Sequence, residues 1–405
     1  SRPITMTSFL KKVGLATEEV GQVKVQSASL ISYPLKPLQF NENTQKPFNI
    51  VFVLSDSLRA DMLNSVNMPH TWKIAEDNIR FENHYSSGNA TRAGIFGLFY
   101  GLPPSYWHSV LKGQIPSAFI TALQTKGYQI EAFTSARLTS PEFNKTVFAS
   151  VGGIRLGSEG QSSWERDLDS VSDFSEWVKQ IRQPFFSFIF LDNIHAYETD
   201  PKQKPTFKPA WTSVNNLKLN NDLDPTEYFN LYKNAVWDTD RNIEKIWAIL
   251  KKENLLDNTI VIISSDHGEE FNDNHQNYWG HNGNFTDAQI KIPLVIHWPG
   301  KKTQVYSHMT TAYDLTATLM PEVLGCTNPT QDYSVGTRLW EPKQKNWFIV
   351  GSYQNSAIVE QDRIVLINGA GFLSFKDRQY RETSHETRTP NLLEAIELMS
   401  RYRQK

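Results

Sequence analysis

The sequence predicts an α/β fold: a mostly parallel sheet sandwiched by helices, followed by a small antiparallel sheet and a helix at the C-terminal end. Between residues 49 and 298, short and nearly continuous apolar runs alternate with helical patterns. Strands buried on both faces of a parallel sheet have this appearance, and their alternation with helices is typical of a sheet covered on both faces. After about residue 345 the pattern changes to closely spaced short strands.

Each element is predicted from its local pattern. We expect strands over Asn49–Asp56, Gln129–Ala136, Phe185–Asp192, Asn258–Asp266 and Ile292–Trp298. Helical patterns cover residues 68–78, 115–127, 172–182 and 228–258. The last pattern is long and amphipathic, with apolar residues repeating along one helix face.

These patterns divide the chain into three parts. Residues 1–46 are polar and contain prolines without a core pattern, which indicates a linker segment. Residues 47–345 carry the alternating strands and helices. Residues 346–405 hold four short strand-like runs and a closing helix over 390–405, which predicts a small β-sheet and helix subdomain.

Composition excludes several classes of protein. Of the 405 residues 39% are hydrophobic and 12% aromatic, which is enough to form a packed core. The formal net charge of −2 gives no basic field for nucleic acid. Cys326 is the only cysteine, so no internal disulfide forms. No apolar run approaches the roughly 18–20 residues that span a bilayer. The chain begins at Ser1 without a signal peptide, and we expect it to be a soluble part of a longer protein.

The stretch from Ser264 to Gly283, SSDHGEEFNDNHQNYWGHNG, gathers three histidines and several carboxylates directly after an apolar run. An acidic, solvated loop is one interpretation. A metal site at the carboxyl end of a strand is the other. Ligands gather beyond the carboxyl ends of the strands in open α/β sheets. Asp56, Asp266 with His267, and His195 each follow a predicted strand, although an Asp in such a place is commonly only a cap or turn residue.

A fourth component is SSGNATRAGIFGLFYG, Ser86 to Gly101, in which small polar residues lead into an apolar helix. Asn89 or Thr91 could serve as an ordinary N-cap. Alternatively Thr91 is a nucleophile, since a divalent cation stabilises the alkoxide of a coordinated hydroxyl. The helix start would offer NH groups to a phosphate or sulfate, and Arg92 could add positive charge there.

The chain resembles the alkaline phosphatase/sulfatase superfamily over about residues 48–340. The motifs NIVFVLSDSLRADML, SSGNATRAGIFG, DNIHAY, VIISSDHGEEF, WGHNG, IPLVIHWPG and TAYDLTATLMPEVLG occur in that superfamily's order. Within it the chain looks like the lipid-headgroup branch of lipoteichoic acid synthases and phosphoethanolamine transferases. The segments SSGNATRAGIFGLFYGLPPSYW and YPLKPLQF are most similar to the periplasmic domain of an inner-membrane member.

The resemblance implies functional roles for single residues. Asp56, Thr91, Asp266 and His267 match the metal-and-nucleophile set; His195 and His281 match histidines that hold the substrate or protonate its leaving group. Asn89 and Arg92 lie beside the nucleophile as candidate substrate contacts. Three oxygens and one imidazole suit one divalent cation, with Mn²⁺ or Mg²⁺ favoured and Zn²⁺ allowed. His275 and Glu269 are interpreted as solvated loop residues.

Two departures narrow the expected chemistry. Sulfatases carry a modified cysteine or serine, beginning a Cys/Ser-x-Pro/Ala-x-Arg pattern, where this chain reads NATRAG. Sulfatases also commonly carry paired aspartates after the first strand, where this chain has Asp56 followed by Ser57. An ordinary sulfatase is therefore not expected, and one metal is favoured over two.

The resulting hypothesis is a metal-dependent phosphohydrolase or phospho-group transferase whose threonine nucleophile acts on or near envelope lipids. The alternative is a non-catalytic lipid-binding regulatory domain on the same fold. The resemblance implies a periplasmic domain anchored to the inner membrane of a Gram-negative bacterium by an N-terminal transmembrane region, and a link to lipopolysaccharide homeostasis. Residues 1–46 are then membrane-proximal, and Lys11 and Lys12 are candidate contacts for anionic lipid or lipopolysaccharide.

Overall fold

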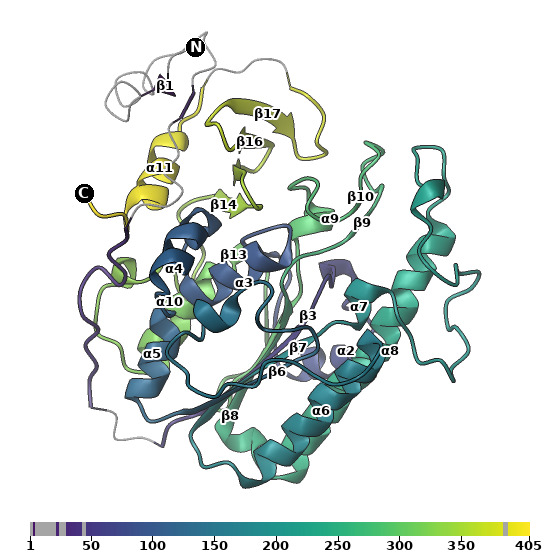
Figure 1. Ribbon diagram of the computed structural model, residues 1–405, viewed down its shortest axis with the longest axis horizontal. Coiled ribbons are helices and arrows are strands. Elements are labelled where there is room, and N and C mark those ends of the chain that lie inside the picture. Colours follow the sequence, from purple (N-terminus) through teal and green to yellow (C-terminus); the bar gives the residue numbers. More distant parts are fainter. Residues whose placement is uncertain (1–2, 5–21, 24–29, 43–45, 384–387) are drawn as a thin grey trace.

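The computed structural model describes residues 3–4, 22–23, 30–42, 46–383 and 388–405. Its main body contains a seven-stranded sheet with the strand order β12-β4-β11-β8-β3-β7-β6 (Figure 1). The strands are β3 (Asn49–Ser55), β4 (Ile79–Phe81), β6 (Gln129–Thr134), β7 (Phe185–Leu191), β8 (Thr259–Ser265), β11 (Leu294–His297) and β12 (Gln304–Tyr306). β3 runs parallel to its neighbours β7 and β8, and β6 runs parallel to β7. β11 is antiparallel to both β8 and β4. Since the other pairings named above are parallel, the predicted mostly parallel sheet is confirmed.

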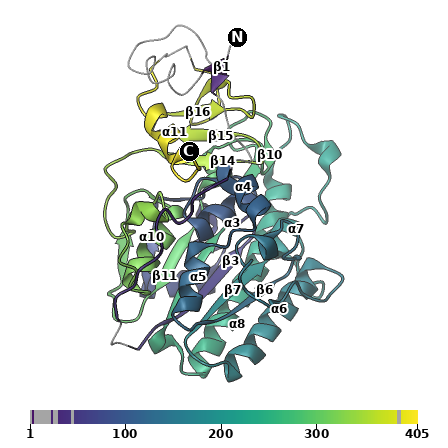
Figure 2. The ribbon, with the colours of Figure 1, turned by 60° about the vertical axis from the view of Figure 1, so that its left-hand side comes forward.

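Helices cover both faces of this sheet, as Figures 1 and 2 show. Alternate residues of β3 point to opposite sides, and each set belongs to a different core. Phe52 and Leu54 pack among residues of the α3, α5 and α10 side. Val51 and Val53 pack among residues of the α2, α6 and α8 side. The helices are α2 (Pro69–Asp77), α3 (Thr91–Tyr100), α4 (Trp107–Gly113), α5 (Ala118–Thr125), α6 (Ser163–Gln180), α8 (Thr226–Lys252) and α10 (Tyr313–Glu322).

All of the predicted strands are present, with ends shifted by a few residues. The helical patterns at 68–78, 115–127 and 228–258 correspond to α2, α5 and α8, whereas the pattern at 172–182 is only the second half of α6. β4, β12 and α10 were not predicted as elements. β4 and β12 are three residues long, too short to show a periodicity of their own.

The C-terminal part forms the predicted antiparallel sheet and helix. Its elements are β14 (Phe348–Gly351), β15 (Ser356–Val359), β16 (Arg363–Ile367), β17 (Leu373–Asp377) and α11 (Leu392–Ser400). One face of the sheet packs against α11, and the other joins a core cluster with residues of the main body such as Tyr85 and Ile290. In Figure 2 the small sheet lies across the end of the main body where α3 begins.

Short elements complete the described chain. Three two-stranded pairs join β1 (Pro3–Ile4) with β2 (Gln22–Val23), β5 (His84–Tyr85) with β13 (Thr310–Thr311), and β9 (Glu270–Phe271) with β10 (Trp279–Gly280). The short helices are α7 (Asn193–Ala196), α9 (Asp287–Ile290), η1 (Ala60–Met62), η2 (Pro104–Tyr106), η3 (Phe143–Lys145), η4 (Asn216–Lys218), η5 (Leu256–Asn258) and η6 (Thr330–Asp332). In the part of the chain that the structure describes, no helix combines the length and apolar character needed to cross a membrane. Lys11 and Lys12 lie outside the described residues.

Candidate metal centre

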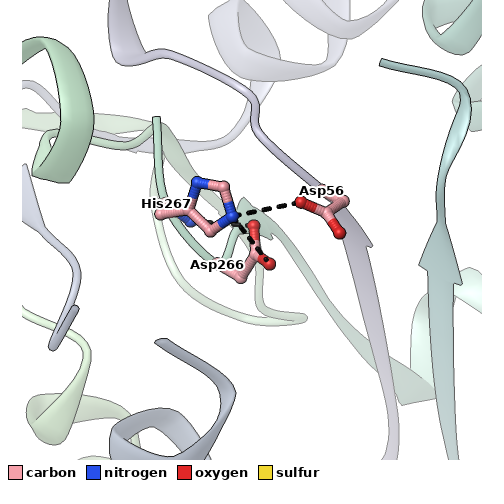
Figure 3. A group of neighbouring side chains, drawn as sticks. All are labelled: Asp56, Asp266 and His267. Carbon is pink, nitrogen blue, oxygen red and sulfur yellow. Dashed lines mark hydrogen bonds and ion pairs between the residues drawn. The ribbon is translucent and has the colours of Figure 1, made fainter. Parts of the chain in front are cut away.

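Strand register brings two aspartates together at one edge of the large sheet. Asp56 directly follows β3 and Asp266 directly follows β8, and the last residues of these strands, Ser55 and Ser265, are paired. His267 comes next in the chain. Asp56, Asp266 and His267 are all buried, and each offers a ligand atom within 4.8 Å of the others (Figure 3). This carboxylate and imidazole donor set suits a divalent cation.

The electrostatics of the cluster fit a cation. Burial raises the pKa of Asp266 to about 6, and the neighbouring charge of Asp56 acts in the same direction. Burial also tends to raise the pKa of Asp56, but the hydrogen bond with His267 and the charges of nearby histidines hold it below its usual range. Burial lowers the pKa of His267, yet the two carboxylates more than offset this and raise it to about 10. A positive charge is thus strongly favoured between the carboxylates.

One ligand atom of the cluster has no hydrogen-bond partner among the described residues. Asp266 Oδ2 accepts no hydrogen bond from them and lies 3.5 Å from His267 Nε2. Its other oxygen, Oδ1, accepts the backbone N–H of Ser57 and of His267. A buried carboxylate oxygen without a donor is costly unless a cation occupies the space beside it. The residues present therefore fit a divalent metal.

Thr91 lies beside these three residues as the first residue of α3. Its Oγ1 is 3.2 Å from Asp56 Oδ2 and 3.5 Å from His267 Nε2. The N-cap residue of α3 is Ala90, and no side chain caps this end. The N-cap interpretation of Asn89 or Thr91 is therefore wrong, and the Thr91 hydroxyl is directed to the cluster instead.

Packing fixes α3 against the second aspartate. The Ser86 hydroxyl donates to the backbone carbonyl of Asp266. Gly94 approaches the same carbonyl so closely that a Cβ there would lie 2.1 Å from its oxygen. No side chain larger than hydrogen fits at that position without a shift of α3 or of the strand end. Glycine therefore permits the close approach of the helix start to the metal-binding residues.

His195 and His281 also lie beside the cluster. His195, in α7, has Nδ1 3.6 Å from Asp56 Oδ1 and 3.5 Å from Ser57 Oγ, and its side chain is 41% exposed. The charge of Asp56 raises the pKa of His195. The ring centroid of His281 lies 4.4 Å from that of His267 and 5.3 Å from that of His195. The two predicted histidines are thus grouped around one space with the metal-binding candidates.

The interpretation of Glu269 as a solvated loop residue is wrong. Its side chain is buried, with Oε1 2.8 Å from His281 Nδ1, and Oε2 accepts the Tyr197 hydroxyl at 2.5 Å. The physical reason is the β9–β10 pair, in which Gly280 is opposite Glu270, so that the next residues, Glu269 and His281, meet. Sequence reasoning missed this because the pair is only two residues long on each side.

The remaining candidates have different surroundings. The Asn89 side chain is buried and donates to the Asn284 carbonyl, while its Oδ1 has no described partner. Arg92 donates to the Tyr353 carbonyl and lies over the rings of Tyr353 and Trp107. Its described contacts are therefore with the C-terminal part and α4, away from the Thr91 hydroxyl. His275 is exposed, as expected for a loop residue.

Ser57 is a site residue that sequence reasoning did not select. Its φ of 66° is in the left-handed region, which is uncommon for a residue with a Cβ. This backbone turn lets its N–H donate to Asp266 Oδ1 and its hydroxyl donate to Asp56 Oδ1 at 2.9 Å. Ser57 therefore links the two aspartates. The available signal was its place directly after Asp56.

Comparisons with known proteins show which family and fold this chain resembles. A family model described as sulfatase matches residues 48–326. The inner membrane protein YejM of Salmonella typhimurium is 28% identical over 92% of this chain and 58% of its own length. Among solved structures, a Vibrio parahaemolyticus protein of the alkaline phosphatase superfamily has a TM-score of 0.62 at 17% identity, covering 91% of each chain. A phosphonate monoester hydrolase of Agrobacterium radiobacter has a TM-score of 0.64 at 16% identity, covering 87% of this chain and 96% of its own.

The two structural likenesses show the fold, because their sequence identities are low. The chain spans less than two thirds of the length of YejM, so the comparison with that protein covers only part of it. The family match, by contrast, extends over more than half of this chain and includes Asp56, Thr91 and Asp266. On this basis the protein belongs to the sulfatase family.

Proposed function

We propose that this protein is a divalent-metal-dependent phosphohydrolase or phospho-group transferase, with Thr91 as nucleophile, acting on or near envelope lipids. The observation that carries the proposal is the position of the Thr91 hydroxyl, 3.2 Å from Asp56 Oδ2 and 3.5 Å from His267 Nε2. A threonine at this place favours phosphoryl transfer over sulfate ester hydrolysis, since the family's sulfatases use a modified cysteine or serine.

Asp56, Asp266 and His267 would hold the cation, with the Thr91 hydroxyl beside them. Mn²⁺ and Mg²⁺ suit the oxygen donors, and Zn²⁺ is also compatible with them. When bound, the cation lowers the pKa of a ligating hydroxyl and stabilises negative charge on phosphoryl oxygens.

The protein's own residues then account for one phosphoryl transfer. The Thr91 oxygen forms a bond to phosphorus as the bond from phosphorus to the leaving oxygen breaks. Backbone N–H groups at the start of α3 hydrogen-bond to the phosphoryl oxygens. His281 or His195 donates a proton to the leaving oxygen, and the Thr91 hydroxyl proton replaces it. Water, or a lipid hydroxyl in the transferase case, then attacks the phosphothreonine and restores the threonine.

The test is hydrolysis of a generic aryl phosphate with and without Mn²⁺ or Mg²⁺. We expect cation-dependent turnover, little turnover of the aryl sulfate, and loss of nearly all activity in Thr91→Ala. Thr226→Ala is a matched control, because Thr226 is likewise the first residue of a helix but lies in α8. The Thr91→Ala variant should still fold, since removing a hydroxyl at a helix start costs at most about 2 kcal/mol. Equal turnover in wild-type protein and Thr91→Ala would contradict the proposal.

Metal content is measured on the same proteins. We expect about one divalent cation per chain after soaking, as one cluster of three ligands would hold it. Asp56→Ala and Asp266→Ala should each abolish binding. Elemental analysis that finds no metal in soaked wild-type protein would rule out the catalytic role of the cluster.

A second candidate function is that of a non-catalytic lipid-binding regulatory domain. The similarity to an inner membrane protein over 92% of this chain supports a place at the envelope. In that case the chain is a periplasmic domain of a Gram-negative inner-membrane protein, joined to its own transmembrane region and binding anionic lipid or lipopolysaccharide through Lys11 and Lys12. Lys11→Ala with Lys12→Ala should then weaken binding to anionic vesicles without changing aryl phosphate hydrolysis. Salt-independent binding that ignores both lysines would remove this role from the segment.

A further inference from the structure

The segment 201–219, which we call the α7–α8 loop, carries a local concentration of positive charge. It contains Lys202, Lys204, Lys208 and Lys218 and no Asp or Glu. The two ends of the connection between α7 and α8 carry Glu198, Asp200, Asp222 and Asp224, so the positive charge is confined to its middle part. All of these lysines are exposed. Within the described part of the chain none of their ammonium groups forms an ion pair. The only interaction found for these groups is that of Lys218, which lies 5.7 Å from the centroid of the Trp211 ring.

The same loop exposes aliphatic side chains among these lysines. Leu217, in η4, is 97% exposed, and Val214, three residues earlier, is 37% exposed. Trp211, another three residues earlier, is half-buried. A single exposed leucine needs no explanation, but here it belongs to a repeated apolar spacing flanked by unpaired lysines. Apolar side chains set among basic ones are typical of a surface that enters the headgroup region of a membrane.

The base of the loop is anchored, so that these side chains are held outward from α8. Asn234 Oδ1 accepts the backbone N–H groups of Thr206 and Phe207. Asn230 donates to the Pro209 carbonyl. The backbone N–H of Trp211 donates to the backbone carbonyl of Glu227. In Figure 1 the chain between α7 and α8 extends beside the outer end of α8.

The loop is also linked through aromatic rings to a segment that enters the candidate metal centre. It starts shortly after His195 in the sequence. The Trp211 ring stacks on Tyr228 with a centroid distance of 4.8 Å, and Tyr228 stacks on Trp279 at 6.0 Å. Trp279 is two residues before His281. A row of three aromatic rings thus connects the loop with Trp279, two residues before a histidine of the site.

We propose that the α7–α8 loop docks on the surface of a membrane that contains anionic lipids. The four lysines, which form no ion pair with the described residues, match the negative potential of a surface that contains anionic lipids. Leu217 and Val214 would enter the headgroup region. Nucleic acid is the less suitable occupant, because exposed aliphatic side chains gain nothing from a phosphate backbone in water. The docking proposal does not require that the protein is an enzyme. If the proposed function also holds, docking brings lipid phosphoesters to the metal centre.

The experiment is co-sedimentation of the 405-residue chain with phosphatidylcholine vesicles that contain about one third phosphatidylglycerol, at low and high salt. We expect binding that falls with salt and is weak on phosphatidylcholine alone. Replacing the four loop lysines with Gln should lower vesicle affinity about tenfold or more, and Leu217→Ser about threefold or more. The matched control combines Lys251→Gln, Lys252→Gln and Val66→Ser, which alter exposed lysines at the end of α8 and a 64% exposed valine elsewhere.

The outcomes separate this proposal from the others. Vesicle binding uses no turnover, so an inactive metal centre leaves the result intact. Unchanged affinity in the lysine variant, or an equal loss in the control, would overturn the docking role of the loop. Affinity that depends only on Lys11 and Lys12 would also overturn it. Binding of duplex DNA in preference to vesicles, with the same lysine dependence, would make the loop a nucleic-acid surface instead.

Discussion

The Glu269 carboxylate orients His281, one of the two histidines beside the metal-binding candidates. Its Oε1 is 2.8 Å from His281 Nδ1, and its Oε2 accepts the Tyr197 hydroxyl. Because this carboxylate is buried and accepts only, it favours the His281 tautomer with the proton on Nδ1. Nε2 of His281 is then the nitrogen that faces the leaving oxygen, and it donates a proton there when the ring is in its protonated form. Glu269 acts through His281 and is therefore a positioning residue.

Glu269→Gln should lower kcat for aryl phosphate about 10–100-fold, as loss of such supporting contacts commonly does. Metal content should stay at the wild-type level, because Glu269 is not one of the three clustered ligands. Tyr197→Phe should give a smaller decrease, since it removes only one donor to the carboxylate. Glu82→Gln, at a half-exposed surface position, is the control. Unchanged kcat in Glu269→Gln would show that His281 needs no orientation for turnover.

At the scale of elements, helix α3 depends on the absence of a side chain at Gly94. The ideal Cβ position there lies 2.1 Å from the Asp266 carbonyl oxygen. Gly97 faces Ser87 in the same way, with a Cβ position 2.0 Å from the Ser87 hydroxyl oxygen. Since Thr91 is at the start of this helix, a displacement of α3 moves the Thr91 hydroxyl relative to Asp56.

Gly94→Ala should therefore reduce turnover about 100-fold, the effect that a shift of about 1 Å commonly has. Overpacking should also lower the free energy of unfolding by about 1–3 kcal/mol. Helix propensity acts in the opposite direction, because Ala favours a helix over Gly by about 1 kcal/mol. Gly152→Ala is the control, as nothing lies within 4 Å of its added Cβ. Wild-type turnover in Gly94→Ala would mean that α3 and the end of β8 can separate without cost to the site.

The strands of the large sheet were predictable because buried parallel strands are continuous apolar runs, and β3, β7 and β8 have that form. Asp56 and Asp266 were predictable as neighbours because parallel strands end at one edge of a sheet. The role of Glu269 was not predictable, since it depends on the two-residue strands β9 and β10. The backbone turn at Ser57 likewise leaves no periodic pattern in the sequence. Pattern analysis thus missed features that depend on very short elements and single backbone turns, because these leave no periodicity in the sequence.

At the scale of the whole molecule, the C-terminal sheet packs against the part of the body that contains the candidate metal centre. The Phe348 ring lies 4.7 Å from the Tyr85 ring, centroid to centroid, and both belong to one core cluster. Arg378, after β17, forms an ion pair with Asp287 of α9 at 2.5 Å. Arg92, next to Thr91 in α3, donates to the carbonyl of Tyr353 between β14 and β15. The start of α3 is thus held by residues 346–405 as well as by the large sheet.

Phe348→Ala tests whether the predicted subdomain 346–405 unfolds with the body or by itself. Because Phe348 is buried against the body, we expect the free energy of unfolding of the whole chain to fall by about 3 kcal/mol in a single transition. Urea unfolding followed by tryptophan fluorescence measures this value, and amide hydrogen exchange compares β14–β16 with β3. Phe372→Ala is the matched control, since Phe372 lies in the same sheet region but is 37% exposed, and its loss should have little effect. If β14–β16 instead exchange early while β3 keeps its wild-type protection, residues 346–405 form an independent unit, and their contacts with α3 do not stabilise the site.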